Sequence, residues 1–169
     1  VNKIIGVAKS FSSQVGAGPF PTVTYYSTFD VLRGSGKNVD DEFGARTGRA
    51  RRLGWLDIPV IRFANMINGF DELAICKLDK LDSLDEIKIC TGYKYKDTVI
   101  DVFTSTDILK DVQPIYTMLP GWNSSTAGIT KYEELPANAR KYIEFIEQST
   151  GVAVKYIGTG PSRNDLICR

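Results

Sequence analysis

A short apolar run in the middle of the chain, Leu73 to Cys76, most constrains the fold. Four residues are too few for a helix, and an unbroken apolar run of this length is typical of a strand buried on both faces of a parallel or mixed sheet. Lys77, Leu78 and Asp79 would then lie at the carboxyl end of that strand, where open α/β sheets bind ligands. The run therefore indicates both a fold class and the place of a binding site.

Four other segments have the residue patterns of strands: residues 4–11, 87–95, 98–103 and 152–157. The first and last are short β-branched and apolar runs that end in loops. The middle two alternate apolar and polar residues on either side of Lys96-Asp97, which predicts a small antiparallel β hairpin. The chain therefore combines a buried sheet with a hairpin.

Two segments, 56–67 and 135–146, repeat apolar residues at helical spacing. The residues expected near a helix start and just past a helix end accompany them: Pro59 and Gly69 for the first, Pro136 and Gly151 for the second. With 169 residues, 43% of them hydrophobic, the chain can bury one core. We expect one α/β domain over residues 1–169, a mixed sheet segment with flanking helices and a small antiparallel hairpin.

Composition excludes several classes of function. The sequence contains no histidine, which rules out histidine acid–base catalysis, histidine-activated nucleophiles and histidine metal sites within this chain. Its 21 basic and 20 acidic side chains give no excess charge that would favour a nucleic-acid or membrane partner. No apolar stretch approaches the roughly 20 residues needed to cross a bilayer. The three cysteines, Cys76, Cys90 and Cys168, lack Cys-x-x-Cys spacing and fit a reducing compartment, so we expect a cytoplasmic protein.

A long polar loop over about residues 34–52 contains the first candidate site. Its second half, Gly44 to Arg52, carries four arginines among glycines just before a predicted helix. Arginine forks bind carboxylates and phosphates bidentately, and glycines let backbone N–H groups approach an anion. From the residues alone, a solvated basic loop is an equally good interpretation, and an RNA-binding patch is a weaker one.

The second candidate is Lys77-Leu78-Asp79 at the end of the buried strand. Guanine presents two adjacent donors, N1–H and its 2-amino group, and one fixed carboxylate can accept both. Asp79 could therefore select guanine while the aliphatic stem of Lys77 lies along the base. The same three residue types recur at Lys80-Leu81-Asp82, so a charged strand end without a ligand is the alternative.

A third candidate follows the last predicted strand, at Gly158-Thr159-Gly160-Pro161. Loops of small residues leave room for a nucleotide base and offer backbone groups to its polar edge. Taken alone, the tetrapeptide also fits a tight turn. All three candidates lie at carboxyl ends of predicted strands or in the loops beside them, which raises the case for each.

Several long motifs, taken in order, resemble the adenylosuccinate synthetase family. They are Val15-Gly16-Ala17-Gly18-Pro19-Phe20-Pro21-Thr22, Glu42-Phe43-Gly44 through Thr47-Gly48-Arg49 to Gly54-Trp55-Leu56-Asp57, Lys77-Leu78-Asp79, Pro114-Ile115-Tyr116 with Leu119-Pro120-Gly121-Trp122, and Gly160-Pro161. The resemblance covers nearly the whole chain and is to the family's C-terminal part, about its last 169 residues. It implies that the α/β segment is part of a larger P-loop-type α/β fold.

The resemblance also implies a role for each candidate segment. In this family GTP phosphorylates the 6-oxygen of IMP in the presence of Mg²⁺, and the amine of L-aspartate then displaces phosphate to give adenylosuccinate. The implied aspartate- and IMP-binding residues are Ala45, Arg46, Thr47, Gly48, Arg49, Ala50 and Arg51, with Thr47 and Arg49 on the aspartate carboxylates and Arg51 also reaching the GTP phosphates. The implied guanine contacts are Lys77, Leu78, Asp79, Gly158, Thr159 and Gly160.

This sequence departs from the family pattern at three of these positions. Arg46 stands where threonine is usual, Ala50 where a basic residue is usual, and Gly158 where serine is frequent. The family's phosphate loop, its catalytic Asp and His and its hold on Mg²⁺ belong to the N-terminal half, so no catalytic or metal-binding residue is expected here. The resemblance thus implies a chain inactive alone that completes a homodimeric ligase of AMP biosynthesis. The alternative is a stand-alone guanine-nucleotide binding or assembly module without ligase activity.

Overall fold

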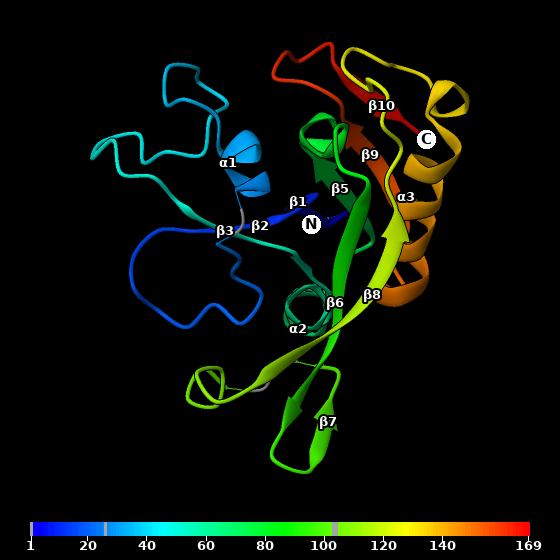
Figure 1. The fold of residues 1–169 in the computed structure, drawn as a ribbon. Coiled ribbons are helices and arrows are strands. Elements are labelled where there is room, and N and C mark those ends of the chain that lie inside the picture. Colours follow the sequence, from blue (N-terminus) through cyan, green and yellow to red (C-terminus); the bar gives the residue numbers. More distant parts are fainter. Residues whose placement is uncertain (1, 26, 103–104) are drawn as a thin grey trace.

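The computed structural model describes residues 2–25, 27–102 and 105–169, and these form a mixed α/β fold (Figure 1). The strands are β1 (Ile5–Lys9), β2 (Ser12–Gln14), β3 (Arg52–Gly54), β4 (Leu56–Asp57), β5 (Glu72–Cys76), β6 (Glu86–Tyr95), β7 (Thr98–Ile100), β8 (Gln113–Pro120), β9 (Val154–Gly158) and β10 (Leu166–Cys168). The helices are α1 (Thr28–Arg33), α2 (Ile58–Asn68) and α3 (Ala137–Thr150), with short 3₁₀ turns η1 (Leu78–Leu81) and η2 (Tyr132–Glu134).

The sheet that carries β5 has the strand order β1-β5-β9-β10. β5 runs parallel to β1 on one side and to β9 on the other, while β10 is antiparallel to β9, so the sheet is mixed as expected. Leu73 and Ile75 are fully enclosed on one face of β5, whereas Ala74 and Cys76 on the other face are only partly buried, so the strand is confirmed but its burial on both faces is not. Because β1, β5 and β9 are parallel, their carboxyl ends meet at one edge of the sheet (Figure 1).

A long antiparallel ladder forms a second sheet. β6 and β7 make the predicted hairpin, paired from Tyr93 with Ile100 to Tyr95 with Thr98. The predicted second strand reached residue 103, but β7 ends at Ile100, and residue 103 itself lies outside the described residues. The larger partner of β6 is β8, which the sequence patterns did not predict, and β4 adds a short parallel pairing to β6.

The helices begin and end close to the predicted residues. Asp57 caps α2 by accepting the Val60 N–H at 3.4 Å, and Gly69 ends it in the left-handed region at φ 64°. The predicted helix began at Leu56, but Leu56 lies in β4. Asp57 is the N-cap, so the first helical residue is Ile58. α3 begins at Ala137, so Leu135 and Pro136, which the prediction included in the helix, lie just before it. It ends before the left-handed Gly151, as predicted.

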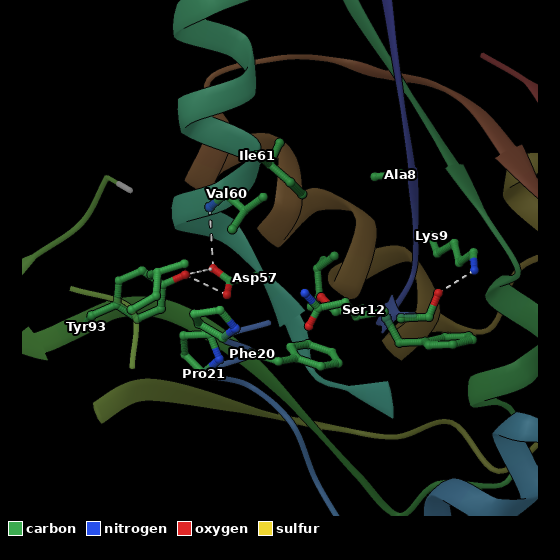
Figure 2. Close-up of a pocket in the computed structure, with 15 residues that line it drawn as sticks. Ala8, Lys9, Ser12, Phe20, Pro21, Asp57, Val60, Ile61 and Tyr93 are labelled. Carbon is green, nitrogen blue, oxygen red and sulfur yellow. Dashed lines mark hydrogen bonds between the residues drawn. The ribbon is translucent and has the colours of Figure 1, made fainter. Parts of the chain in front are cut away.

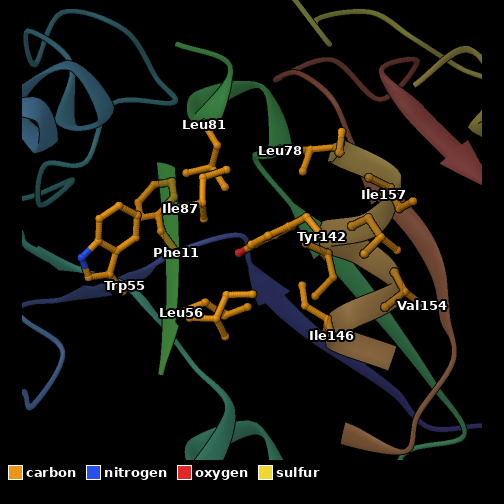
Figure 3. Close-up of a cluster of buried hydrophobic side chains, with 14 of the residues drawn as sticks. Phe11, Trp55, Leu56, Leu78, Leu81, Ile87, Tyr142, Ile146, Val154 and Ile157 are labelled. Carbon is orange, nitrogen blue, oxygen red and sulfur yellow. The ribbon is translucent and has the colours of Figure 1, made fainter. Parts of the chain in front are cut away.

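The hydrophobic core joins both sheets and α3. Figure 3 shows Trp55, Leu56 and Ile87 facing Tyr142 and Ile146 across the interior. Tyr142 is fully enclosed, and its hydroxyl donates to the carbonyl of Ser10 at 2.5 Å, just beyond the end of β1. α3 therefore helps to fix the edge of the sheet at which the parallel strands end.

The β2–β3 pair brings two distant loops together. Ser12 to Gln14 run antiparallel to Arg52 to Gly54, so the loop over 15–21 and the end of the arginine-rich loop leave the same short sheet. The Arg52 guanidinium reinforces this join by donating to Gln14 Oε1 at 2.8 Å and to the carbonyl of Gly18 at 2.7 Å. Both loops are thus held at the carboxyl end of β1.

Candidate functional site

The carboxyl ends of β5 and β9 border a cavity of about 420 Å³, here called the strand-end cavity. Its lining comes from three parts of the chain: Val39 and Asp40; Cys76, Lys77, Asp79 and Lys80; and Gly158, Gly160, Pro161, Ser162, Arg163, Asp165 and Leu166. The predicted segments 77–79 and 158–161, about eighty residues apart in sequence, therefore meet at one cavity because β5 and β9 are parallel neighbours.

Asp79 differs from the other acids of this cavity. Asp40 forms an ion pair with Lys80 at 2.5 Å, and the Asp165 carboxylate accepts the Ser162 N–H at 3.0 Å. Within residues 2–25, 27–102 and 105–169, no other residue forms a hydrogen bond or ion pair with the half-buried Asp79 carboxylate. Burial raises the pKa of Asp79, an effect only partly opposed by the nearby Lys80 cation and by a hydrogen bond from the backbone N–H of Asp79 itself. Its acceptor oxygens are available to a ligand.

Lys77 holds an unusual backbone conformation at the mouth of this cavity. Its φ of 64° lies in the left-handed region, which costs an L-residue about 1–2 kcal/mol. Ser10 Oγ donates to the Lys77 carbonyl at 2.7 Å and so contacts this backbone directly. The Lys77 side chain is held as well, because Nζ donates to Glu42 Oε1 and to the Asp40 carbonyl, both at 2.6 Å. The geometry at the end of β5 is therefore held by specific polar contacts.

Two predicted guanine contacts, Leu78 and Thr159, turn their side chains away from the cavity. Leu78 is completely buried in the hydrophobic core. Thr159 is also fully buried, and its hydroxyl donates to the carbonyl of Ile129 at 2.8 Å. Any contact from these two residues to a base would have to come from their backbone.

The two glycines of the third predicted segment have different steric environments. At Gly158, where serine is frequent in the resembled family, an added methyl group would lie 3.4 Å from Cys76 Cα, an ordinary contact, so a Cβ atom is accommodated here. At Gly160 the same group would lie 2.5 Å from Asp165 Oδ2 and force that side chain to move. Glycine is therefore needed at 160 for the close approach of Asp165.

Residues 44–50, here called the arginine turn, project into solvent. The Gly44 N–H donates to the Arg49 carbonyl at 2.9 Å, and the Gly44 carbonyl accepts the Gly48 N–H at 2.8 Å. Gly48 has a φ of 62°, a conformation that favours glycine. Residues 45–50 are exposed, and in the described parts of the chain neither Arg46 nor Arg49 has a side-chain ion pair or hydrogen bond. The turn thus offers uncommitted guanidinium groups to an anion.

Arg51 differs from these two arginines because its charge is already paired. Arg51 Nη1 donates to Glu42 Oε2 at 2.9 Å, and Lys9 and Lys77 reach the same carboxylate at 2.8 and 2.6 Å. Burial alone would raise the pKa of Glu42, but the hydrogen bonds from Lys77, Lys9 and Arg51 lower it to about 2. The implied contact of Arg51 with GTP phosphates stays a prediction.

A second cavity, of about 400 Å³, lies beside the loop over 15–21 (Figure 2). Phe20, Pro21 and Ile61 give it an apolar wall, and the Asp57 carboxylate lies at its edge, where Tyr93 donates to both oxygens at 2.6 Å. Burial raises the pKa of Asp57 to about 6, although the bonds from Tyr93 and the backbone oppose that rise. Asp57 is also the N-cap of α2, so its bonds to Tyr93 and Val60 give it a structural role at this position.

The repeated tripeptide has two separate roles in the structure. Asp79 faces the strand-end cavity, whereas Asp82 accepts the indole N–H of Trp122 at 2.7 Å and both the backbone N–H and the hydroxyl of Thr126, at 2.7 and 2.8 Å. Asp82 therefore anchors the segment after β8. The alternative that Lys-Leu-Asp is only a charged strand end does not fit Asp82, which has these three hydrogen bonds, while the guanine contact of Asp79 stays a prediction.

Sequence reasoning did not single out Glu42 or Asp57 as functional candidates. Glu42 appeared only within the Glu42-Phe43-Gly44 motif, and Asp57 within the Gly54-Trp55-Leu56-Asp57 motif, beside the start of the predicted helix. Neither position carries a local signal of burial, since the charges that surround Glu42 come from residues 9, 51 and 77.

The described part of the chain holds no group of three Cys, Asp or Glu side chains suited to a metal, and none of its helices has the length and apolar character needed to span a bilayer.

Comparison with known proteins agrees with the motifs. The family model described as adenylosuccinate synthetase matches residues 1–167. The chain is 61% identical over its whole length to adenylosuccinate synthetase 1 of Methanosarcina acetivorans and 46% identical to the adenylosuccinate synthetase of Uncinocarpus reesii, covering 40% of each. A structure of fully ligated adenylosuccinate synthetase from Plasmodium falciparum superposes with a TM-score of 0.92 at 35% identity, covering all of this chain and 40% of that one.

The chain thus spans about two fifths of the length of the relatives it matches, and the matched region is their C-terminal part. The fold, the order of motifs and the family model agree over almost every residue. The chain belongs to the adenylosuccinate synthetase family.

Proposed function

We propose that this chain supplies the guanine pocket and the amino-acid-binding turn of a ligase that joins L-aspartate to IMP, converting GTP to GDP and phosphate. The strand-end cavity carries the proposal. It combines an unpaired, half-buried carboxylate, Asp79, with small residues at Gly158 and Gly160, which is the chemistry a guanine base requires. The chain belongs to the adenylosuccinate synthetase family, and this membership supports the same function.

In the proposed complex, the Asp79 carboxylate accepts guanine N1–H and the 2-amino group. Adenine has no such pair of donors, so the carboxylate selects between the two bases. The stem of Lys77 borders the base, with its ammonium held away by Glu42 and Asp40. Backbone groups around Gly158 complete the polar edge, since the side chain of Thr159 is committed elsewhere.

The arginine turn is the proposed site for L-aspartate and faces the IMP side. Arg49 and Thr47 bind the two carboxylates of the amino acid, and the glycines at 44 and 48 let backbone N–H groups approach them. Because Arg46 and Arg49 are exposed and unpaired within the described residues, no internal ion pair has to break on binding. Arg51 is proposed to lie toward the GTP phosphates.

The Mg²⁺ that accompanies GTP in the resembled family has no set of ligands among the described residues. Its ligands, and the groups that phosphorylate IMP, are proposed to lie outside these 169 residues. A homodimer and a cytoplasmic location complete the proposal, in keeping with the family resemblance.

Changing Asp79 to asparagine tests the guanine pocket. The variant is made in a chimera in which this chain replaces the matching 169 residues of the Methanosarcina acetivorans relative. One acceptor oxygen becomes a donor that opposes the donors of guanine, and a lost buried hydrogen bond costs about 1–3 kcal/mol. We expect kcat/KM for GTP to fall by roughly one to two orders of magnitude, with a smaller effect on ITP, which lacks the 2-amino group.

Asp82→Asn is the matched control because it alters the same residue type three positions along. Asp82 is bonded to Trp122 and Thr126, so the variant should have a lower thermal midpoint. The ratio of kcat/KM for GTP to kcat/KM for ITP should stay unchanged. Equal changes in that ratio for both variants would remove the case for Asp79 as the guanine reader.

The 169-residue chain by itself should form no adenylosuccinate from IMP, GTP and aspartate. The reason is that the resembled family's phosphate loop and acid–base pair have no counterpart in this sequence, which contains no histidine. The product is followed by its absorbance, with the chimera as the positive control. Turnover by the chain alone would contradict the proposed division of the site, whereas an inactive chimera would contradict the ligase function itself.

A further inference from the structure

We propose that Glu42 is a positioning residue that holds Lys77 at the guanine pocket and Arg51 beside the arginine turn, so that one carboxylate sets the geometry of both substrate sites. The inference rests on the proposed function and adds a residue to which no role has been assigned. Glu42 touches neither cavity and has no exposed surface, so it acts only through the cations around it.

The contacts of Glu42 join three separate parts of the fold. Its Oε1 accepts Lys77 Nζ at 2.6 Å, its Oε2 accepts Arg51 Nη1 at 2.9 Å, and both oxygens accept Lys9 Nζ at 2.8 Å. Lys77 follows β5, Lys9 ends β1, and Arg51 follows the arginine turn. The Glu42 carboxylate is thus the point at which the loop over 34–52 is fixed to the edge of the parallel sheet.

Each partner of Glu42 belongs to a different binding feature. Lys77 lines the strand-end cavity, Lys9 lines the cavity beside the loop over 15–21, and Arg51 continues directly from the arginine turn. The backbone supports the same arrangement, because the Arg51 N–H donates to the Glu42 carbonyl at 2.9 Å and the Glu42 N–H donates to the Arg33 carbonyl at 2.8 Å. A shift of the carboxylate would therefore move groups in more than one site.

Charge balance explains why an acid is required at this position. Three cations surround one anion, and without that anion they would repel one another at close range. Among the described residues, Lys77 Nζ would keep only the Asp40 carbonyl as an acceptor. A neutral isostere at 42 keeps the volume but cannot hold the cations together.

The test compares Glu42→Gln with Glu72→Gln in the same chimera. Glu72 is a suitable control because it also binds a lysine, Lys3 at 2.6 Å, and lies at the opposite end of β5 from Lys77. For Glu42→Gln we expect KM for GTP and KM for aspartate to rise together by about tenfold, the size expected for lost charge-assisted hydrogen bonds. For Glu72→Gln both values should stay at the wild-type level.

The pattern of kinetic effects separates positioning from a purely structural role. A lower thermal midpoint with unchanged KM values would overturn the proposal, since Glu42 would then stabilise the fold alone. A rise in KM for only one of the two substrates would also overturn it, because the proposal assigns both sites to one carboxylate. Asp79→Asn provides the contrast, as it should alter GTP selection without changing KM for aspartate.

A second measurement does not depend on turnover. Limited trypsin digestion of the chimera, read by mass spectrometry, reports whether Glu42 restrains Arg51. Glu42→Gln should speed cleavage after Arg51 by about tenfold, while Glu72→Gln should not. Equal cleavage rates in wild type and Glu42→Gln would overturn the inference even if the chimera proved inactive, an outcome that would by itself count against the proposed function.

Discussion

Replacing Arg49 with leucine in the chimera should lower kcat/KM for aspartate by roughly one to two orders of magnitude, because a charge-assisted contact is worth about 1.5–3 kcal/mol. Arg49 is exposed in the arginine turn and makes no side-chain ion pair among the described residues. Its loss should therefore leave the thermal midpoint unchanged. Initial rates at varied aspartate, together with thermal unfolding, measure the two quantities.

Arg52→Leu is the contrasting variant for this prediction. The Arg52 guanidinium already bonds Gln14 and Gly18 and lies over the Phe20 ring at 5.6 Å, so its removal should lower stability rather than aspartate use. Unaltered aspartate kinetics in Arg49→Leu would refute the assigned role. A large drop in its thermal midpoint would instead indicate that the arginine turn is structural.

The parts of the fold that sequence predicted well are those fixed by local chemistry. α2 was located because Asp57, Pro59 and Gly69 mark its ends through capping and a left-handed stop. β5 was located because its unbroken apolar run is too short for a helix and is typical of a buried strand, although only the face of Leu73 and Ile75 is fully buried. In both cases residues next to one another in the chain determine the outcome.

β8 escaped prediction because its pattern is weak and its partner is distant. Gln113–Pro120 begins and ends beside prolines, which usually argue against a strand, and several of its side chains are exposed. The strand is nevertheless held by its ladder with β6, from Glu86 with Pro120 to Lys94 with Gln113. As an outer strand of that sheet, β8 can accommodate prolines that a central strand could not.

For the candidate site, strand ends predicted which segments would meet but not which side chains would face the cavity. Asp79 and Lys77 line it as expected, whereas Leu78 and Thr159 turn into the interior. The difference arises in η1, where the chain leaves β5 through the left-handed Lys77 and begins a 3₁₀ turn. Strand alternation therefore does not extend past Cys76.

Acid should affect the chain through Glu42 and Asp57 with opposite signs. The folded-state pKa of Glu42 is about 2, below its ordinary value of 4.5, so its contribution to stability is complete above pH 4.5 and is lost as the pH falls toward 2. The folded-state pKa of Asp57 is about 6, above its ordinary 3.8, so its ionisation destabilises the fold above pH 6, and stability is regained as the pH falls from 6 to 3.8. One pKa unit corresponds to about 1.4 kcal/mol, so the effect is at most about 3.5 kcal/mol for Glu42 and at most about 3 kcal/mol for Asp57.

The free energy of unfolding of the 169-residue chain, measured with denaturant at a series of pH values, should therefore rise as the pH falls from 6 to 4.5, change little from 4.5 to 3.8, where the two effects oppose each other, and fall at lower pH. Asp57→Asn should remove the rise, and since asparagine also caps helices well, it should do so without disrupting α2. Glu42→Gln should flatten the fall below pH 4.5 and lower stability at neutral pH, where three cations lose their common acceptor. Parallel pH profiles for wild type and Glu42→Gln would show that the carboxylate is not held ionised by Lys9, Arg51 and Lys77, and the positioning role proposed for it would lose its physical basis.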